Sequence, residues 1–272
     1  MFKRLITLFK LGRKLAKSDA LTIVSKFNKP PLLVTVIFKL LSFSFTKKDM
    51  SHDNLSEGEK LSNSLASMGT TFIKLGQFLA TRPDIIGDAL SKELENLQDK
   101  LPPFSQSKAK EMIKSDLGDE LYNSIINIGE PVAAASIAQV HEAILKDGES
   151  VVVKIVRPGL DKRISADVNS IKFLGGLAEL ILSDARRLKL MDLIREYELV
   201  ITAETDLKKE AANAIQTKNF FKENSLLYIP EVYENFSSKN VMTMEKISGI
   251  PVTDIEVLKK ENINLKALAE TG

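Results

Sequence analysis

An Asp-Gly pair at 147–148 stands between two short segments that are rich in Ile, Val and Ala. Asp-Gly favours a two-residue β-turn whose backbone twist matches that of two antiparallel strands. The pattern therefore predicts a hairpin with strands over 136–145 and 150–156. A third short strand is predicted over 123–128, so this part of the chain favours an antiparallel sheet.

The segment that precedes these strands has helical periodicity instead. Ser56 followed by Glu59 matches a capping box. Apolar residues then recur at spacings of three and four, which predicts one buried helical stripe. These residues are Leu61, Leu65, Met68, Phe72, Leu75 and Leu79. Arg82-Pro83 predicts a break before a second helix, and a shorter helix is predicted over 107–116.

Helical periodicity returns from residue 164 to about residue 223. Two more strands are then predicted over 231–236 and 241–244, joined by a polar turn. Helices followed by a mostly antiparallel sheet, which one long helix interrupts, are typical of an α+β fold.

Composition excludes several kinds of site. The chain has no cysteine, so disulfides, zinc–thiolate centres and cysteine nucleophiles are excluded. Its only histidines are His52 and His141, so a histidine-rich metal site is not expected, and no metal ligand is assigned.

The charge of the chain is unevenly distributed. Residues 1–50 contain eleven Lys or Arg against two Asp, a net of +9, while the remaining residues carry a net of −7. Residues 1–17 combine these cations with Phe, Leu and Ile, which favours binding to a membrane surface and anionic lipids. The apolar stretch 32–45 fits either membrane contact or a core or partner-docking helix. No nucleic-acid motif is present, so nucleic acid is not an expected partner.

The order of elements after residue 121 suggests where chemistry resides. The elements follow the order of a protein-kinase N-lobe. They are a strand, a loop of small residues, a strand that ends in Lys154, a helix with acidic residues and two further strands. In that fold a helix glutamate pairs with the strand lysine and orients it toward phosphates. Glu204, Asp206 and Glu210 are predicted to share one helix that could supply this glutamate.

Five segments together resemble the UbiB-type atypical kinase-like family. They are K-x-G-Q at 74–77, "AAAS" at 133–136, "VVVK" at 151–154, "ETDLKKEAAN" at 204–213 and "MEKISGIPVTD" at 244–254. The resemblance implies a kinase-like N-lobe preceded by a helical K-x-G-Q extension. It also implies ATP as cofactor and a role in ubiquinone biosynthesis, with pathway enzymes or lipid intermediates as partners.

The resemblance assigns roles to individual residues. Lys154 would bind phosphates and Glu210 would be its helix partner, while Glu245 would bind the nucleotide from the hinge segment. The nucleotide-covering loop would be Ala133, Ala134, Ala135 and Ser136. Lys74, Gly76 and Gln77 would form a lid motif that faces the E-x-D residues Glu204 and Asp206. His141 is interpreted as structural.

The loop differs from that of ordinary kinases because alanine replaces glycine. Glycine reaches backbone conformations that a Cβ forbids, and these let amide groups approach phosphates closely. An alanine loop is therefore expected to hold phosphates in a different pose and to support poor protein-kinase activity.

The expected organisation is a membrane-associating segment over 1–50, the helical extension over 51–120, the N-lobe over 121–246, and the hinge with the start of a C-lobe over 247–272. The catalytic-loop Asp and the metal-binding Asp of kinases are not found, so the chain is interpreted as a truncated form that does not turn over ATP. Mg²⁺ is expected only in a full-length protein.

Two other functions compete with that of an atypical kinase. The alternative from a different class is a non-catalytic, pseudokinase-like binding module that associates with membranes. Direct ring hydroxylation is disfavoured, since the sequence has no flavin fingerprint, no haem-type cysteine and no histidine–carboxylate iron triad. The expected location is the cytoplasmic face of a bacterial inner membrane, with peripheral attachment.

Overall fold

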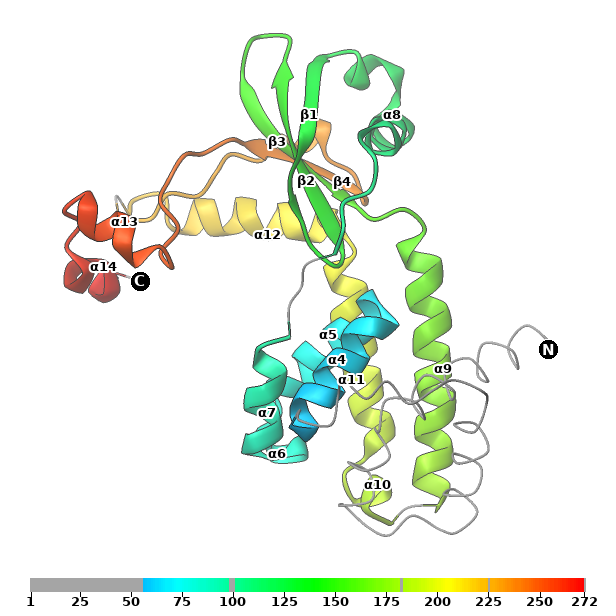
Figure 1. The fold of residues 1–272 in the computed structure, drawn as a ribbon. Coiled ribbons are helices and arrows are strands. Elements are labelled where there is room, and N and C mark those ends of the chain that lie inside the picture. Colours follow the sequence, from blue (N-terminus) through cyan, green and yellow to red (C-terminus); the bar gives the residue numbers. More distant parts are fainter. Residues whose placement is uncertain (1–55, 98–100, 182, 225, 272) are drawn as a thin grey trace. The chain divides into compact units, whose positions relative to one another are not determined.

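The computed structural model describes residues 56–97, 101–181, 183–224 and 226–271 (Figure 1). Contacts divide the chain into two units. The helical unit contains residues up to Pro102 together with Ala135–Ile137 and Arg157–Thr205. The sheet unit contains Pro103–Ala134, Ala138–Val156 and the residues from Asp206 onward. These contacts do not test the boundaries predicted for the helical extension, residues 51–120, and for the N-lobe, residues 121–246.

The described part of the helical unit consists of helices and their connections. They are α4 (Glu57–Met68), α5 (Thr70–Ala80), α6 (Pro83–Ile86), α7 (Asp88–Glu95), α9 (Leu160–Ile181), α10 (Ser183–Arg187) and α11 (Leu190–Glu204).

The sheet unit combines a four-stranded sheet with flanking helices. Its strands are β1 (Ile125–Ala134), β2 (Ala138–Leu145), β3 (Ser150–Val156) and β4 (Val241–Glu245), and neighbouring strands in the order β1-β2-β3-β4 pair antiparallel. Its helices are α8 (Gln106–Tyr122), α12 (Leu207–Phe220), the 3₁₀ turn η2 (Glu234–Phe236), α13 (Ile255–Lys260) and α14 (Leu265–Thr271). The α+β class predicted from the sequence is confirmed.

The predicted helix start at Ser56 is confirmed. The Ser56 hydroxyl accepts from the backbone N–H of Glu59, and the Glu59 carboxylate accepts from the N–H of Ser56. The apolar stripe that follows does not belong to a single helix, because the chain breaks at Gly69. Gly69 has a φ of 100°, which a residue with a Cβ rarely adopts.

The predicted long helix over 164–223 is likewise divided, into α9, α10, α11 and α12. Lys189 adopts the left-handed conformation with a φ of 51° immediately before α11. A second break follows at Thr205–Asp206, where the backbone of Asp206 is extended. Neither break has a glycine or proline, so the sequence pattern did not indicate them.

The hairpin predicted around Asp147-Gly148 is confirmed. Gly148 has a φ of 89° and donates its N–H to the Leu145 carbonyl at 2.9 Å. The strand predicted over 231–236 was wrong. This segment makes an isolated bridge between Val232 and Met244 and then forms the η2 turn.

Side chains of β3 alternate between the two faces of the sheet. Val151, Val153 and Ile155 are fully buried in a cluster that includes Ala109 and Ile113 of α8. Because successive strand residues point to opposite faces, Lys154 lies on the face that is turned away from α8.

The predicted basic segment 1–50 lies outside the described residues. Within the ranges that the structure describes, no helix is long and apolar enough to cross a membrane.

Two adjacent glycines of α9 provide a test of the helix packing. A Cβ on Gly175 would lie 2.2 Å from Cδ1 of the buried Ile194, whereas a Cβ on Gly176 would meet nothing within 4 Å. We expect Gly175→Ala to lower the free energy of unfolding by about 1–3 kcal/mol through overpacking. Gly176→Ala should raise it by up to about 1 kcal/mol, because alanine favours helix. Urea unfolding measures both, and equal shifts would contradict this packing.

Candidate functional site

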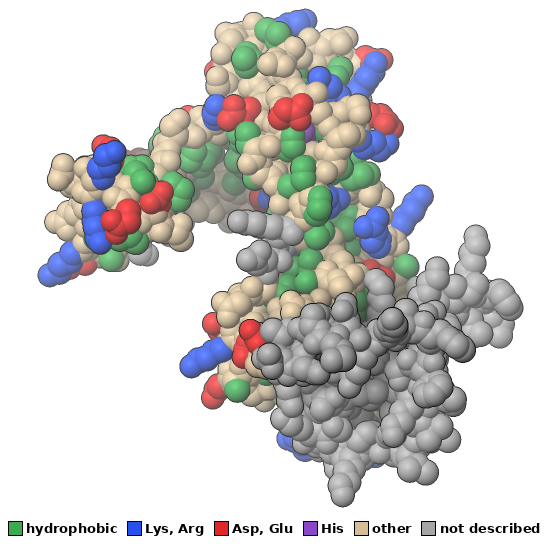
Figure 2. Space-filling model, viewed as in Figure 1, with side chains coloured by type: hydrophobic (Ala, Val, Ile, Leu, Met, Phe, Trp, Pro, Cys, Tyr) green, Lys and Arg blue, Asp and Glu red, His purple; other side chains and the backbone are tan. Residues whose placement is uncertain are grey.

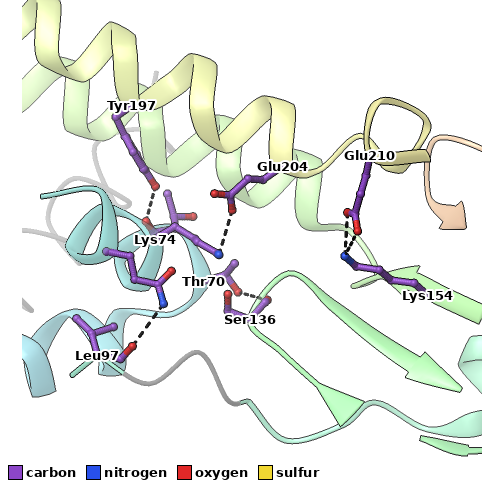
Figure 3. A network of polar contacts seen from close by, with 10 residues as sticks. Thr70, Lys74, Leu97, Ser136, Lys154, Tyr197, Glu204 and Glu210 are labelled. Atoms are coloured by element: carbon purple, nitrogen blue, oxygen red, sulfur yellow. Dashed lines mark hydrogen bonds and ion pairs between the residues drawn. The ribbon is translucent and has the colours of Figure 1, made fainter. Parts of the chain in front are cut away.

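Lys154 and Glu210 form an ion pair inside the sheet unit (Figure 3). The Lys154 ammonium donates to both carboxylate oxygens of Glu210, at 2.6 and 2.8 Å. Their side chains are 29% and 43% exposed, so the pair is open to solvent on one side. The structure thus brings together the lysine and the helix glutamate that the family resemblance paired.

Local structure explains why Glu210 reaches the sheet. Asp206 caps α12 by accepting from the backbone N–H of Lys208 at 3.1 Å. Leu207 is fully buried and donates its N–H to the Lys239 carbonyl at 2.9 Å, which anchors the helix start. Glu210 follows one turn later, beside the buried Ala211, so its side chain lies at the edge of the packed helix face.

The three acidic residues do not share one helix, which corrects the sequence-based expectation. Glu204 is the last residue of α11, whereas Glu210 lies in the first turn of α12. Asp206 lies between the two helices and serves as a helix cap. The reason is the break at Thr205–Asp206, since the extended backbone of Asp206 restarts the hydrogen-bond pattern.

The helical unit contains a second ion pair of interest. The Lys74 ammonium on α5 lies 3.1 Å from a carboxylate oxygen of Glu204, and the side chains are 18% and 40% exposed (Figure 3). This is the lysine of the K-x-G-Q segment and the glutamate of the E-x-D segment. The pair therefore joins α5 to the end of α11 within one unit.

The other two residues of the K-x-G-Q segment pack within the helical unit. A Cβ on Gly76 would lie 2.7 Å from Cδ1 of Leu97 and 2.9 Å from Cδ1 of Leu65. Gly76 is therefore a close-packing position, as its place inside a helix suggested. The Gln77 amide donates to the Leu97 carbonyl at 3.4 Å.

A buried tyrosine holds α5 against α11. The hydroxyl of Tyr197 donates to the backbone carbonyl of Thr71, and the Tyr197 ring lies 5.7 Å from that of Phe78. Burial raises the pKa of Tyr197 far above its usual value, and the negative charges of Glu204 and Asp167 raise it further. Tyr197 therefore remains protonated and able to donate at any physiological pH.

The alanine-rich segment is only partly a loop. Ala133 and Ala134 end β1 and pair with Val140 and Gln139 of β2, so the apex is Ala135–Ile137. The loop predicted over 133–136 therefore begins two residues too early. Ser136 is fully buried, and its hydroxyl has no hydrogen-bond partner among the described residues.

His141 is fully buried in a hydrogen-bond chain. Its Nδ1 lies 2.8 Å from the Gly129 carbonyl, which can only accept, so Nδ1 carries the proton. Nε2 then accepts from the Gln139 amide at 2.7 Å, and Gln139 also bonds both backbone groups of Phe104. These contacts support the structural interpretation of His141.

The carboxylate of Glu245 is engaged at the end of β4. It accepts from the hydroxyl of Tyr228 at 2.5 and 2.6 Å and from the backbone N–H of Glu231 at 3.1 Å. The Tyr228 hydrogen bond, followed by that backbone bond, lowers the pKa of Glu245. The backbone N–H of Glu245 donates to the Glu231 carbonyl at 2.8 Å, so a contribution of Glu245 to nucleotide binding would come from its backbone carbonyl.

The sequence reasoning missed Arg157, which follows β3. Its guanidinium donates to the carbonyls of Ala135, Pro102 and Leu101 at 2.8, 3.0 and 3.1 Å. The signal available in the sequence was an Arg-Pro-Gly run directly after the strand that ends in Val156. Arginine presents a planar fork of donors that suits several acceptors at once.

No group of three or more His, Cys, Asp or Glu that could hold a metal ion occurs in the part of the chain that the structure describes.

Comparison with known families and curated proteins gives consistent matches. The ABC1 atypical kinase-like domain matches residues 96–272. A probable protein kinase UbiB of Pseudomonas paraeruginosa is 44% identical over 219 residues, covering 80% of this chain and 41% of that protein. A protein with the same description from Cellvibrio japonicus is 40% identical over 243 residues, covering 89% and 43%. This chain therefore spans about two fifths of the length of these curated relatives.

A solved structure shares the fold. The complex of Rv3197 with erythromycin, from Mycobacterium tuberculosis, matches with a TM-score of 0.51 and 29% identity. The match covers 72% of this chain and 51% of that chain. The kinase-like fold that the sequence resemblance implied is confirmed.

A double-mutant cycle tests the Lys74–Glu204 pair. We expect Lys74→Ala and Glu204→Ala to couple by about 0.5–1 kcal/mol in urea unfolding, because water screens the half-exposed Glu204. Glu198 provides a matched control, since it lies on the same helix and pairs with Lys172. Lys74→Ala combined with Glu198→Ala should be additive. Additive free energies in both cycles would show that Lys74 and Glu204 do not interact in solution.

Proposed function

Because this chain belongs to the ABC1 atypical kinase-like family, we propose that it binds ATP on its sheet unit and supports ubiquinone biosynthesis. The observation that carries the proposal is the ion pair between Lys154 and Glu210. The names of the curated relatives, probable protein kinases UbiB, support the assignment to an ATP-dependent pathway of this kind.

The geometry of Lys154 suits it to phosphate binding. The ammonium has three N–H donors, and two short contacts to one carboxylate fix its position beside β3. Because this ammonium is already held in place, its side chain loses little conformational entropy when it binds an anionic ligand. Because the pair is partly exposed, the lysine is also within reach of a ligand.

Other parts of the sheet unit would contact the rest of the nucleotide. Ala133 and Ala134, at the end of β1, would approach the phosphates with a narrower range of backbone conformations than glycine allows. Glu245 ends β4, and its backbone and the hinge segment that follows would contact the base.

We further propose that residues 1–50 attach the protein to the cytoplasmic face of a bacterial inner membrane. Their net charge of +9 contrasts with the net of −7 over residues 51–272. Figure 2 shows Lys and Arg side chains interspersed with Asp and Glu on the described surface. On α13 and α14, for example, Lys259 pairs with Glu256 and Lys266 pairs with Glu270. Attraction to anionic lipid is therefore expected from the basic segment.

Substitution of Lys154 tests nucleotide binding. We expect Lys154→Ala to weaken the binding of ATP to the purified chain by about 10- to 100-fold, because it removes a charged hydrogen-bond donor to phosphate. Isothermal titration calorimetry measures the dissociation constants. Lys114→Ala is the matched control, since Lys114 forms an exposed ion pair with Asp119 on α8 and should leave binding unchanged.

The pathway assignment is tested with the same pair of substitutions in the native gene. Lys154→Ala should lower cellular ubiquinone, measured by chromatography of lipid extracts, and Lys114→Ala should not. Equal ATP affinities for Lys154→Ala and the unmodified chain would refute the nucleotide site. Normal ubiquinone with impaired ATP binding would refute the pathway alone.

Charge neutralisation tests membrane attachment. One variant changes Lys3, Arg4, Lys10 and Arg13 to Gln, and its control changes Lys108, Lys114, Lys259 and Lys266 to Gln. Each cation near an anionic surface contributes about 1 kcal/mol, so the first variant should bind liposomes with anionic lipid much more weakly. Added salt should weaken the unmodified chain as well. Equal co-sedimentation of the two variants would show that residues 1–50 have no special role.

A further inference from the structure

An apolar groove lies between α5, α9 and α11 of the helical unit (Figure 1). Its walls are Leu, Ile, Phe, Ala and Gly residues together with Tyr197, whose hydroxyl already donates to the Thr71 carbonyl. The three helices contribute, among others, Leu75, Leu79, Leu174, Ala178 and Leu193. The described walls therefore leave almost no polar surface to a ligand, and the groove suits apolar groups.

The size of the groove matches a few large side chains. Its volume is about 290 Å³. An apolar cavity of about 150 Å³ holds one benzene molecule, so the groove has room for about two side chains of the size of Phe or Leu. Leu79 and Leu193 are only half-buried, and covering them would favourably remove apolar surface from water.

The same chain contains an apolar segment shortly before α4. Residues 32–45 read LLVTVIFKLLSFSF and lie outside the described residues. If this segment is helical, Thr35, Lys39 and Ser42 fall on one stripe, because residues three and four apart share a helix face. The opposite face then carries a row of large apolar side chains, which are Leu33, Ile37 and Leu40.

The connection to α4 is long enough to reach the groove. Ten residues, 46–55, separate the segment from Ser56, and ten extended residues span up to about 35 Å. Leu65 of the groove follows Glu57, the first residue of α4, by about 12 Å along the helix. A segment tethered this close to a site binds as if it were present at a concentration on the order of millimolar.

The charge around the groove favours a protein segment over an anionic lipid surface. Residues 171–198, which include the α9 and α11 walls, contain five Lys or Arg and five Asp or Glu, so their net charge is zero. Binding to anionic lipid relies on an excess of cations near the surface. The basic excess of this chain lies in residues 1–50, and only Lys39 of it falls within 32–45.

We propose that residues 32–45 dock in this groove through the face that carries Leu33, Ile37 and Leu40. The sequence alone fits this segment equally to membrane contact and to a core or partner-docking helix, and the groove favours docking within the chain. The inference does not depend on the proposed ATP site. It leaves attachment to anionic lipid to the basic residues before Pro30.

Thiol reactivity tests the docking, because the chain has no cysteine of its own. Ala178→Cys places a thiol on the α9 wall of the groove. We expect Ile37→Glu with Leu40→Glu to speed its reaction with a thiol reagent by about 10-fold or more, since an unpaired carboxylate is strongly unfavourable in an apolar groove.

Two controls accompany this measurement. Thr35→Glu with Ser42→Glu adds the same charge on the polar stripe and should leave the reaction of Ala178→Cys slow. Ser165→Cys, at an exposed position of α9, should react at one rate in every background. Equal rates for Ala178→Cys in the two charge variants overturn the proposal.

Disulfide formation tests the docking without an added charge. Cysteine at Ala178 or Leu193 is combined with cysteine at Ile37 or Leu40, which gives four pairs. At least one pair should form an intramolecular disulfide on mild oxidation, which requires Cα atoms within about 7 Å of each other. Lys39→Cys should form none with either groove position, because it lies on the polar stripe. Absence of a disulfide in all four pairs, or equal formation with Lys39→Cys, overturns the proposal.

Two other occupants give different results with Ala178→Cys alone. If a second copy of the chain covers the groove, the thiol becomes reactive on dilution, and light scattering gives the molar mass of a dimer. If a membrane covers it, the thiol is protected only after liposomes with anionic lipid are added. Either result overturns the proposal, whereas protection in a dilute monomer without lipid supports it. None of these measurements involves ATP, so a failure of the proposed ATP site leaves them unaffected.

Discussion

The sheet unit depends on the strict alternation of side chains along β3. Val151, Val153 and Ile155 are all fully buried toward α8, so the side chain of Lys154 must lie on the opposite face of the sheet. A shift of one residue in the pairing would send the lysine into the apolar cluster, at a cost of several kcal/mol for an unpaired buried charge. The hydrophobic core therefore sets the register, and the register places the ammonium where α12 supplies Glu210.

In the helical unit, short helices pack closely enough to make specific side-chain contacts with one another. Its breaks at Gly69 and Lys189 turn long amphipathic segments into several helices that can pack on one another. Gly76 then lets Leu65 and Leu97 approach the backbone of α5. On this packed base, Tyr197 and the Lys74–Glu204 pair connect α5 with α11. The polar contacts follow from the close packing.

Local signals in the sequence predicted much of this structure. The capping box at Ser56, the Asp-Gly turn and the strand that carries Lys154 are patterns over a few residues, and all three are confirmed, although that strand continues past Lys154 to Val156. The resemblance to the UbiB-type family paired Lys154 with Glu210, whereas the order of elements alone left Glu204, Asp206 and Glu210 open. The division of the helix before Glu210 was missed, because Lys189 and Asp206 are not helix-breaking residues by type. The strand over 231–236 was wrong, since an apolar pattern alone does not distinguish an isolated bridge followed by a 3₁₀ turn from a strand.

Contacts from side chain to backbone were the least accessible to sequence reasoning. Arg157 and Thr70 bind carbonyl groups, which every residue has, so the Arg-Pro-Gly run could draw attention to Arg157 but could not reveal which carbonyls accept from it or from Thr70.

The buried hydroxyl of Ser136 has an evolutionary consequence. A buried hydroxyl that finds no partner among the described residues lowers stability by about 1–3 kcal/mol, and alanine would occupy the same space without that cost. The three residues before it are already alanine. Laboratory selection for thermal resistance alone should therefore extend the alanine run by one position at an early round. If serine persists at position 136 under such selection, a requirement other than folding stability retains it.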